Sequence, residues 1–321
     1  MISGGLDSSL AAKLMKDLGV DVYGVYFAMP WGCCDKTKAI EVAQQIGINF
    51  IVLQLDERYL EIVRDPKHGY GTAMNPCRDC RIHMFSRAAQ YMAHIGADFV
   101  FTGEVLGQRP MSQKMDSMRI IEEESGLKGK LLRPLSAQHL EPTEIELSGL
   151  IDRHKLLDLN GRGRRAQLDL AQQHGIPFNQ PAGGCALTDK NFARRMKDTL
   201  EHGYRNFRET IALKWGRHFR FEQYKVILGR DQEENDALIR YAHQDDLIMQ
   251  LCDNMGPTLI LKGEAPSDEL LAKAAGMIQL YSRHKEKEFI DAYVWKKSDK
   301  NEKRLVRSVK TAEAEIESNK I

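Results

Sequence analysis

A short loop rich in serine and glycine lies at the beginning of the chain. It runs Ser-Gly-Gly-Leu-Asp-Ser over residues 3–8, and leucines recur at helical spacing after it, at positions 10, 14 and 18. The loop is therefore expected to open a helix. Its backbone N–H groups and the positive end of that helix favour an anion, and the two glycines allow a phosphate to approach closely. The alternative is an ordinary capped turn. The loop does not match the G-x-x-x-x-G-K-[ST] pattern of kinase-type phosphate loops.

Cysteine is the second residue type that could carry chemistry. Cys77 and Cys80 form a C-x-x-C pair, and Cys185 lies far along the chain. A C-x-x-C pair alone is compatible with zinc, with a redox dithiol or with neither. For zinc, His83 is the nearest further ligand in the sequence.

The remaining cysteines allow weaker statements. Cys33 and Cys34 are either incidental loop cysteines or, alternatively, a sulfur acceptor or a fourth metal ligand. Cys252 lies on an apolar run and is expected to fill a core. Six cysteines in 321 residues are not the disulfide framework of a small secreted protein.

Strands and helices must position these residues. Runs rich in β-branched and aromatic residues predict strands, and apolar residues at helical spacing predict helices, in the order 20–27, 38–46, 50–53, 81–95 and 99–101. Nearly wholly apolar strands that alternate with helices are typical of a parallel sheet covered on both faces. Because ligands bind beyond the carboxyl ends of such strands, the loop and Thr102-Gly103-Glu104 are expected at one edge. Only two residues precede the loop, so its strand is expected to be a stub or to begin upstream of Met1.

Several segments resemble known families. The loop resembles SGG-x-DS of the PP-loop ATP pyrophosphatases, which adenylate a carbonyl oxygen and release pyrophosphate. Residues 102–113 and 132–135 are similar to the TGE-x-LGQ-xx-SQ and LRPL segments of the tRNA 4-thiouridine synthetases. Residues 75–80 and 183–196 are similar to the two cysteine segments of the tRNA 2-thiouridylases. This chain departs from the latter enzymes by carrying Cys77 where they have aspartate.

The resemblance implies ATP-dependent thiolation of a tRNA uridine, by adenylation of a uracil carbonyl and then sulfur transfer. ATP and Mg²⁺ are the implied cofactors, and tRNA and a sulfur donor, either sulfide or a sulfur-carrier protein, are the implied partners. The expected catalytic residues are Asp7, Cys80 and Cys185. The expected nucleotide-binding residues are Ser3, Gly4, Gly5, Asp7, Ser8, Gly103, Gln108, Arg162 and Arg164. The two arginines belong to a Gly-Arg-Gly-Arg-Arg run whose alternative is a solvated helix start.

The resemblance also places Cys80 and Cys185 together. Cys77 would add a third thiolate, and three thiolates suit a [4Fe-4S] cluster with one iron open to sulfide. Cys77, Cys80 and Cys185 are therefore the expected metal ligands. A metal-free persulfide or disulfide pair of Cys80 and Cys185 is the first alternative, and zinc is the second.

The second half of the chain carries local positive charge. Residues 194–230 hold ten Lys/Arg against four Asp/Glu, with aromatic residues between them, and residues 283–310 hold ten against five. Such stretches are either an RNA-facing surface or a solvated face beside ordinary core aromatics. From Lys225 onward the order of motifs resembles the NFACT-R RNA-binding domain, although the family's histidine after Pro257 is absent.

The predicted fold class is therefore α/β: a parallel-sheet PP-loop domain followed by a smaller α+β domain. The expected boundaries are 1–175 for the catalytic domain, 176–220 for a segment carrying Cys185, 221–310 for the RNA-binding domain and 311–321 for a polar tail. The net charge of +1 gives no global argument for nucleic acid, and no long apolar run predicts a membrane partner, so a cytoplasmic protein is expected. A homodimer is the candidate assembly. The alternatives in function are a PP-loop enzyme acting on another base or with a nitrogen nucleophile, and a non-catalytic RNA-binding protein.

Overall fold

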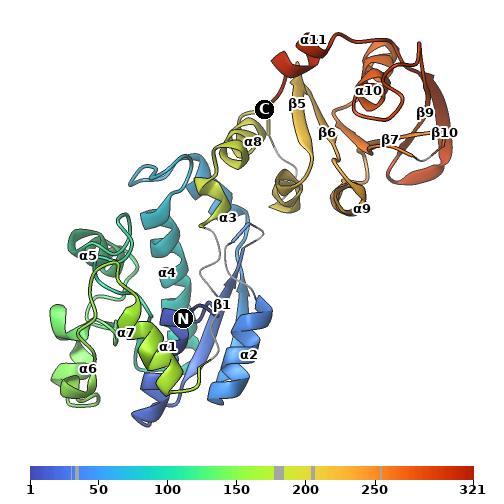
Figure 1. The fold of residues 1–321 in the computed structure, drawn as a ribbon. Helices are drawn as coiled ribbons and strands as arrows, with labels where there is room; N and C mark the ends of the chain where they lie inside the picture. Colours follow the sequence, from blue (N-terminus) through green and yellow to red (C-terminus); the bar gives the residue numbers. More distant parts are fainter. Residues whose placement is uncertain (30, 33–35, 177–183, 204–206, 254) are drawn as a thin grey trace. The chain divides into compact units, whose positions relative to one another are not determined.

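The structure is a computed structural model that describes residues 1–29, 31–32, 36–176, 184–203, 207–253 and 255–321. It contains two compact units, Met1–Thr188 and Asp189–Ile321 (Figure 1). The sequence predicted a boundary near residue 175 and a separate segment up to 220. In the structure, Cys185 belongs to the first unit, and α8 (Lys190–Glu201) belongs to the second.

The N-terminal unit is built on parallel strands, as predicted. β1 (Tyr23–Ala28) pairs in parallel with β2 (Asn49–Gln54), and β3 (Val100–Phe101) pairs in parallel with β4 (Leu131–Leu132). Ile2 N–H donates to the Val25 carbonyl at 2.9 Å, and the Met1 amine donates to the Phe101 carbonyl at 2.8 Å. Residues 1–2 therefore lie between β1 and β3 and align the two strand pairs.

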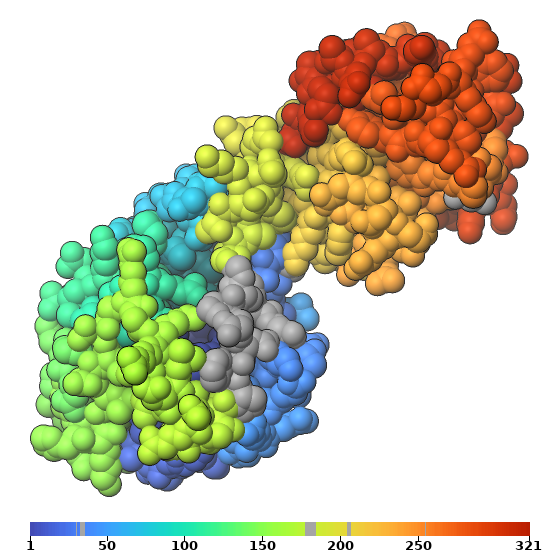
Figure 2. All heavy atoms as spheres, in the orientation of Figure 1, coloured from blue at the N-terminus to red at the C-terminus, as the bar shows by residue number. Residues whose placement is uncertain are grey.

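Helices connect these strands and bury their apolar side chains. The described helices are α1 (Leu6–Asp17), α2 (Lys36–Ile46), α3 (Glu57–Arg64), α4 (Cys77–Ile95), α5 (Met115–Glu124), α6 (Glu144–Leu147) and α7 (Arg165–Gln173). α1 lies at the centre: its Leu6 and Leu10 pack with Ala171 of α7, and its Met15 packs with Leu132. Segments from the start, middle and end of this unit thus share one body (Figure 2).

The C-terminal unit is an antiparallel sheet in the order β10-β9-β7-β8-β6-β5. Its strands are β5 (Arg217–Phe221), β6 (Tyr224–Leu228), β7 (Leu247–Leu251), β8 (Leu259–Lys262), β9 (Asp291–Lys296) and β10 (Asp299–Arg307). α10 (Asp268–Leu280) packs on one face, in a core with Val226, Met249 and Val294. α9 (Gln232–Tyr241) and the 3-10 helix η4 (Phe207–Lys214) pack on the other, in a core with Ile227, Ile248 and Ile260.

The end of the chain differs from the polar tail expected at residues 311–321. Residues Glu313–Ser318 form a short helix, α11, and Ile316 is fully buried in the core beside α10. Ile321 N–H donates to the His218 carbonyl at 2.9 Å. Burial of Ile316 stabilises this otherwise largely polar segment, because it removes an apolar side chain from water. Among the described residues, no helix combines the length and apolar character needed to cross a bilayer.

Candidate active site

The serine-glycine loop is fixed by its own hydroxyl groups. Ser8 Oγ accepts from Ser3 N–H at 3.2 Å and donates to the Gly5 carbonyl at 2.9 Å, and the Ser3 and Ser8 hydroxyls lie 3.0 Å apart. Gly4 has φ +75°, and a Cβ at this position would lie 2.7 Å from the Ala39 backbone nitrogen in α2. A rigid loop at the N-terminus of a 12-residue helix is suited to hold an anion.

Asp7 projects from the first turn of α1 into a polar contact. Its Oδ2 accepts from Gln108 Nε2 at 2.8 Å and lies 3.7 Å from Arg164 Nη2. Its Oδ1 is buried and has no hydrogen-bond partner among the described residues. Burial raises the pKa of Asp7, and the Gln108 hydrogen bond and the Arg164 charge oppose that rise. The buried Oδ1 is therefore an oxygen that a cation or a ligand N–H could satisfy.

The segment after β3 touches the loop directly. A Cβ on Gly103 would lie 2.4 Å from both the carbonyl carbon and the carbonyl oxygen of Asp7, so only glycine fits. The next residue, Glu104, is buried and binds Arg133 Nε at 3.2 Å, with Arg81 Nε at 3.7 Å. The ion pair of Glu104 and Arg133 therefore joins the two segments that resemble TGE and LRPL.

The three predicted sulfur ligands lie near one tyrosine. Cys77 and Cys80 stand on the first turn of α4, whereas the sequence placed them before that helix. The buried Tyr59 hydroxyl of α3 donates to Cys80 Sγ at 3.1 Å. Burial, then Cys80, then Cys185 and Cys77 raise the pKa of Tyr59 well above its ordinary value. Negative charge on any of the three thiolates therefore disfavours ionisation of the Tyr59 hydroxyl, and Cys80 is the one in hydrogen-bond contact with it.

The [4Fe-4S] cluster predicted on Cys77, Cys80 and Cys185 is not supported by this geometry. Within the described ranges, no three His, Cys, Asp or Glu side chains form a group that could hold a metal ion. His83, which zinc would need, packs its ring 6.0 Å from that of Tyr59, and burial lowers its pKa. The predictions for Cys33 and Cys34 lie outside the described residues.

Other sequence predictions have mixed outcomes. Arg164 Nη2 lies 3.7 Å from Asp7 Oδ2, whereas Arg162 is exposed and no contact with another described residue places it at the loop. Cys252 was expected in a core, and this was wrong: it is exposed in the turn that follows β7. Tyr59 was missed, as was Trp31, whose ring stacks on that of Tyr59 at 6.0 Å. The signal that could have found them is their position just after β1 and β2, at the carboxyl ends of the parallel strands.

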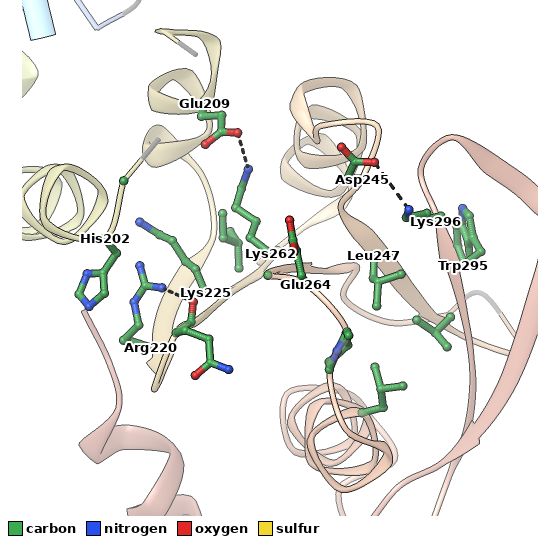
Figure 3. A pocket seen from close by; sticks show the side chains of 18 of the residues that line it. His202, Glu209, Arg220, Lys225, Asp245, Leu247, Lys262, Glu264, Trp295 and Lys296 are labelled. Carbon is green, nitrogen blue, oxygen red and sulfur yellow. Dashed lines mark hydrogen bonds and ion pairs between the residues drawn. The ribbon is translucent and has the colours of Figure 1, made fainter. Parts of the chain in front are cut away.

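The C-terminal unit has a separate polar pocket of about 960 Å³ (Figure 3). Its cations are already paired. Lys225 Nζ lies 2.9 Å from Asp198 Oδ2, Arg220 binds the same carboxylate at 2.8 and 2.7 Å, and Lys262 Nζ lies 3.0 Å from Asp246 Oδ2. Because carboxylates already pair with these cations, the polar lining of the pocket is an internal ion-pair network.

Two family models match the chain, one in its N-terminal unit and one in its C-terminal unit. Residues 1–126 match the family model of the tRNA methyl transferase HUP domain, and residues 216–319 match that of the NFACT protein RNA binding domain. A tRNA-specific 2-thiouridylase MnmA from Tropheryma whipplei is 37% identical over 32% of this chain and 32% of its own length. The MnmA of Clostridioides difficile is 29% identical over 68% of this chain and 63% of its own. The matches thus span from about a third to just under two thirds of these curated relatives.

Among solved structures, a predicted subunit of tRNA methyltransferase from Methanocaldococcus jannaschii aligns over 54% of this chain and 73% of its own, with a TM-score of 0.35 and 18% identity. The two family matches confirm the resemblances read from the sequence: this chain joins a segment similar to tRNA methyl transferase HUP domains to one similar to NFACT RNA-binding domains.

Proposed function

We propose that this protein is an ATP-dependent tRNA sulfurtransferase that thiolates a uridine. The observation that carries the proposal is a continuous set of contacts between the loop and the sulfur residues. Gly103 packs on Asp7 of the loop, Glu104 lies 3.7 Å from Arg81, and Arg81 follows Cys80 in α4. These contacts support a site in which the loop binds the nucleotide, Cys80 supplies sulfur, and one substrate reaches both beyond the carboxyl ends of the parallel strands.

The first half of the proposed reaction uses the loop. Ser3, Gly4, Gly5 and Ser8 hold the pyrophosphate end of ATP at the start of α1, with Arg164 beside it. The uracil carbonyl oxygen attacks the α-phosphorus, the bond to the bridging oxygen breaks, and pyrophosphate leaves. Asp7 fits a Mg²⁺ ion bound to ATP, because its buried Oδ1 has no other partner in the described structure. Such an ion neutralises charge on the leaving pyrophosphate.

The second half transfers sulfur. The thiolate of one cysteine of the Cys80–Cys185 pair attacks the outer sulfur of a donor persulfide, the donor's S–S bond breaks, and the donor leaves as a thiolate, so that the cysteine now carries the persulfide. Its terminal sulfur attacks the activated uracil carbon, the C–O bond breaks, and AMP leaves. The second thiolate then attacks the sulfur still bonded to the first cysteine, which forms a Cys80–Cys185 disulfide and releases the thiolated base, and N3 is reprotonated. A small thiol reductant restores the two thiols. Tyr59 can donate a hydrogen bond to sulfur at Cys80 throughout.

The [4Fe-4S] cluster expected from the sequence on Cys77, Cys80 and Cys185 remains a prediction. Negative charge on these three cysteines raises the pKa of Tyr59, but they do not form a metal-binding group in the described residues. Anaerobically purified protein decides it: about four irons per chain, lost in Cys77→Ala, would establish the cluster. Colourless protein with full thiolation would establish the metal-free route.

The proposal is tested by following both half-reactions in one assay. Purified protein, tRNA, ATP, a small-molecule persulfide donor and a thiol reductant should release pyrophosphate and yield a thiouridine that mass spectrometry of digested nucleosides assigns to C2 or C4. Cys80→Ser and Cys185→Ser should abolish thiolation while pyrophosphate release continues, because adenylation does not use sulfur. The exposed Cys252→Ser is the matched control and should keep both activities.

Three results would overturn it. Thiolation that survives in Cys80→Ser and Cys185→Ser would remove both cysteines from the mechanism. Pyrophosphate release with a modified base that contains no sulfur would indicate another nucleophile. Tight tRNA binding without ATP turnover would indicate an RNA-binding protein whose loop has lost its activity.

A further inference from the structure

The sheet of the C-terminal unit has one face that is only partly covered. Side chains alternate along β9 and β10, so Ala292, Val294 and Val306 point into the core under α10. The residues between them point to the opposite face. There Tyr293 of β9 lies directly across from Leu305 of β10.

α9 and η4 cover the middle of this opposite face. Their core includes Ile248 of β7 and Trp295 of β9, both buried. Coverage stops there: the exposed fractions are 37% for Tyr293, 55% for Leu305 and 42% for Phe289, which precedes β9. An open strip of two aromatic rings and a leucine therefore remains at the β10 edge of the sheet.

Cations are held over these rings. Lys303 Nζ lies 5.5 Å from the Tyr293 ring centre and 5.0 Å from that of Trp295. The Arg307 guanidinium lies 4.2 Å from the Phe289 ring centre and is oriented by Asp291, with Nε to Oδ1 at 3.0 Å. Lys303 forms no ion pair with any described residue. Residues 291–307 hold six Lys/Arg against three Asp/Glu, so the hairpin of β9 and β10 is positive.

We propose that this open strip, made of Phe289, Tyr293, Lys303, Leu305 and Arg307, binds unpaired RNA by stacking bases on its rings. Exposed rings offer flat π faces to any unpaired base, and neighbouring cations attract the phosphates between bases. A duplex keeps its bases inside and could use only the charges. The inference deepens the proposed function, because it names a single-stranded loop or end of the RNA as what the C-terminal unit holds.

A purely structural role makes a different prediction. β10 is an edge strand, and lysines on edge strands discourage pairing with other chains. In that case the charges matter for solubility, and removing the rings leaves RNA affinity unchanged.

The test uses the full chain and three fluorescent RNAs: an oligouridine of about 12 nucleotides, a duplex of the same length, and a tRNA transcript. Tyr293→Thr places a β-branched residue, which also favours strands, at this position, and Phe289→Ser lies outside the strand. Each should weaken oligouridine binding about tenfold, leave duplex binding unchanged, and leave the salt dependence unchanged. Lys303→Gln should instead reduce the slope of log affinity against log salt by about 0.7.

The matched control is Tyr23→Thr, because Tyr23 is an exposed aromatic residue at the start of β1. This control variant should bind all three RNAs with unchanged affinity. A photoactivated 4-thiouridine in the oligonucleotide should crosslink to the peptide that contains Tyr293. If Tyr293→Thr lowers the melting temperature of the protein, the oligouridine affinity of Phe289→Ser decides the result, because Phe289 lies outside the strand. The inference is wrong if the ring variants bind oligouridine as tightly as the unaltered chain, or if they lose as much affinity for the duplex as for oligouridine. If the protein still binds tRNA in that case, the proposed function is unaffected. No binding of any RNA by the unaltered chain overturns the proposed function itself.

Discussion

Gly103→Ala is the sharpest perturbation of the proposed ATP site, because it adds one methyl group where the segment after β3 meets the loop. The new Cβ would lie 2.4 Å from the carbonyl carbon and oxygen of Asp7 and 2.5 Å from the Ser8 nitrogen. These are backbone atoms, so no side chain can rotate away. Contacts between carbon atoms are favourable only from about 3.5 Å. The loop must therefore move by about 1 Å.

Two magnitudes follow from this displacement. Overfilling a packed contact costs about 1–3 kcal/mol, and a loss of 2 kcal/mol lowers the melting temperature of a domain of this size by roughly 4–8 °C. Displacing groups that orient a substrate by about 1 Å costs about a hundredfold in rate. We expect kcat/KM for pyrophosphate release to fall by about that factor while the protein remains folded.

The measurement pairs this variant with Gly163→Ala. A Cβ on Gly163 meets no atom within 4 Å, and its φ is not in the positive range, so the same added methyl should be harmless. Pyrophosphate release is measured against ATP concentration at saturating tRNA, and thermal melting is measured on the same samples. Unaltered kcat/KM in Gly103→Ala would refute the close contact between this segment and the loop, and with it the assignment of Gly103 and Gln108 to the ATP site.

Two further predictions concern buried charge. Burial raises the pKa of Asp7, so its ionised form lowers the stability of the folded protein at neutral pH. Asp7→Asn should therefore melt no lower than the unaltered chain at pH 7, although it should lose pyrophosphate release. A lower melting temperature would contradict the burial argument. Burial also lowers the pKa of Lys225 to about 8 despite Asp198. Between about pH 8 and the ordinary lysine pKa of 10.5, Lys225 therefore binds more protons in the unfolded chain than in the folded one. The free energy of unfolding should rise with pH in that window, by at most about 1.4 kcal/mol per pH unit from this residue. Chemical denaturation at pH 8, 9 and 10 should show this gain, and Lys225→Met should lack it; equal slopes would refute the shift.

Local sequence patterns were sufficient to predict the strands and helices around the loop. The apolar strands and helical leucines predicted parallel pairing, and parallel pairing placed Thr102-Gly103-Glu104 beside residues 3–8. The Gly103 contact with Asp7 agrees with that placement. This worked because the carboxyl ends of parallel strands share one edge whatever the details of packing.

Contacts between distant helices could not be predicted in this way. Tyr59 belongs to α3 and Cys80 to α4, and no periodicity relates the two. β10 was also missed as a strand, because residues 299–305 are all exposed and an edge strand without an apolar face shows no alternation. The same residues appeared in the sequence only as a basic stretch, so the open strip beside Tyr293 became visible only when the strands were paired.

The buried ion pair behind the site explains how one edge could serve two half-reactions. Glu104 is 3% exposed and Arg133 is 4% exposed, and a buried charge without its partner is strongly unfavourable. Arg133 also binds Glu122 Oε2 of α5 at 2.7 Å. The carboxylate that follows Gly103 is therefore fixed on one side by Arg133 and approached on the other by Arg81 of the cysteine helix. Because Gly103 itself packs on Asp7, any movement of α4 that separates Arg81 from Glu104 leaves a buried charge less well paired. The Glu104 ion pairs therefore link the loop to the helix that carries Cys80 and resist their separation.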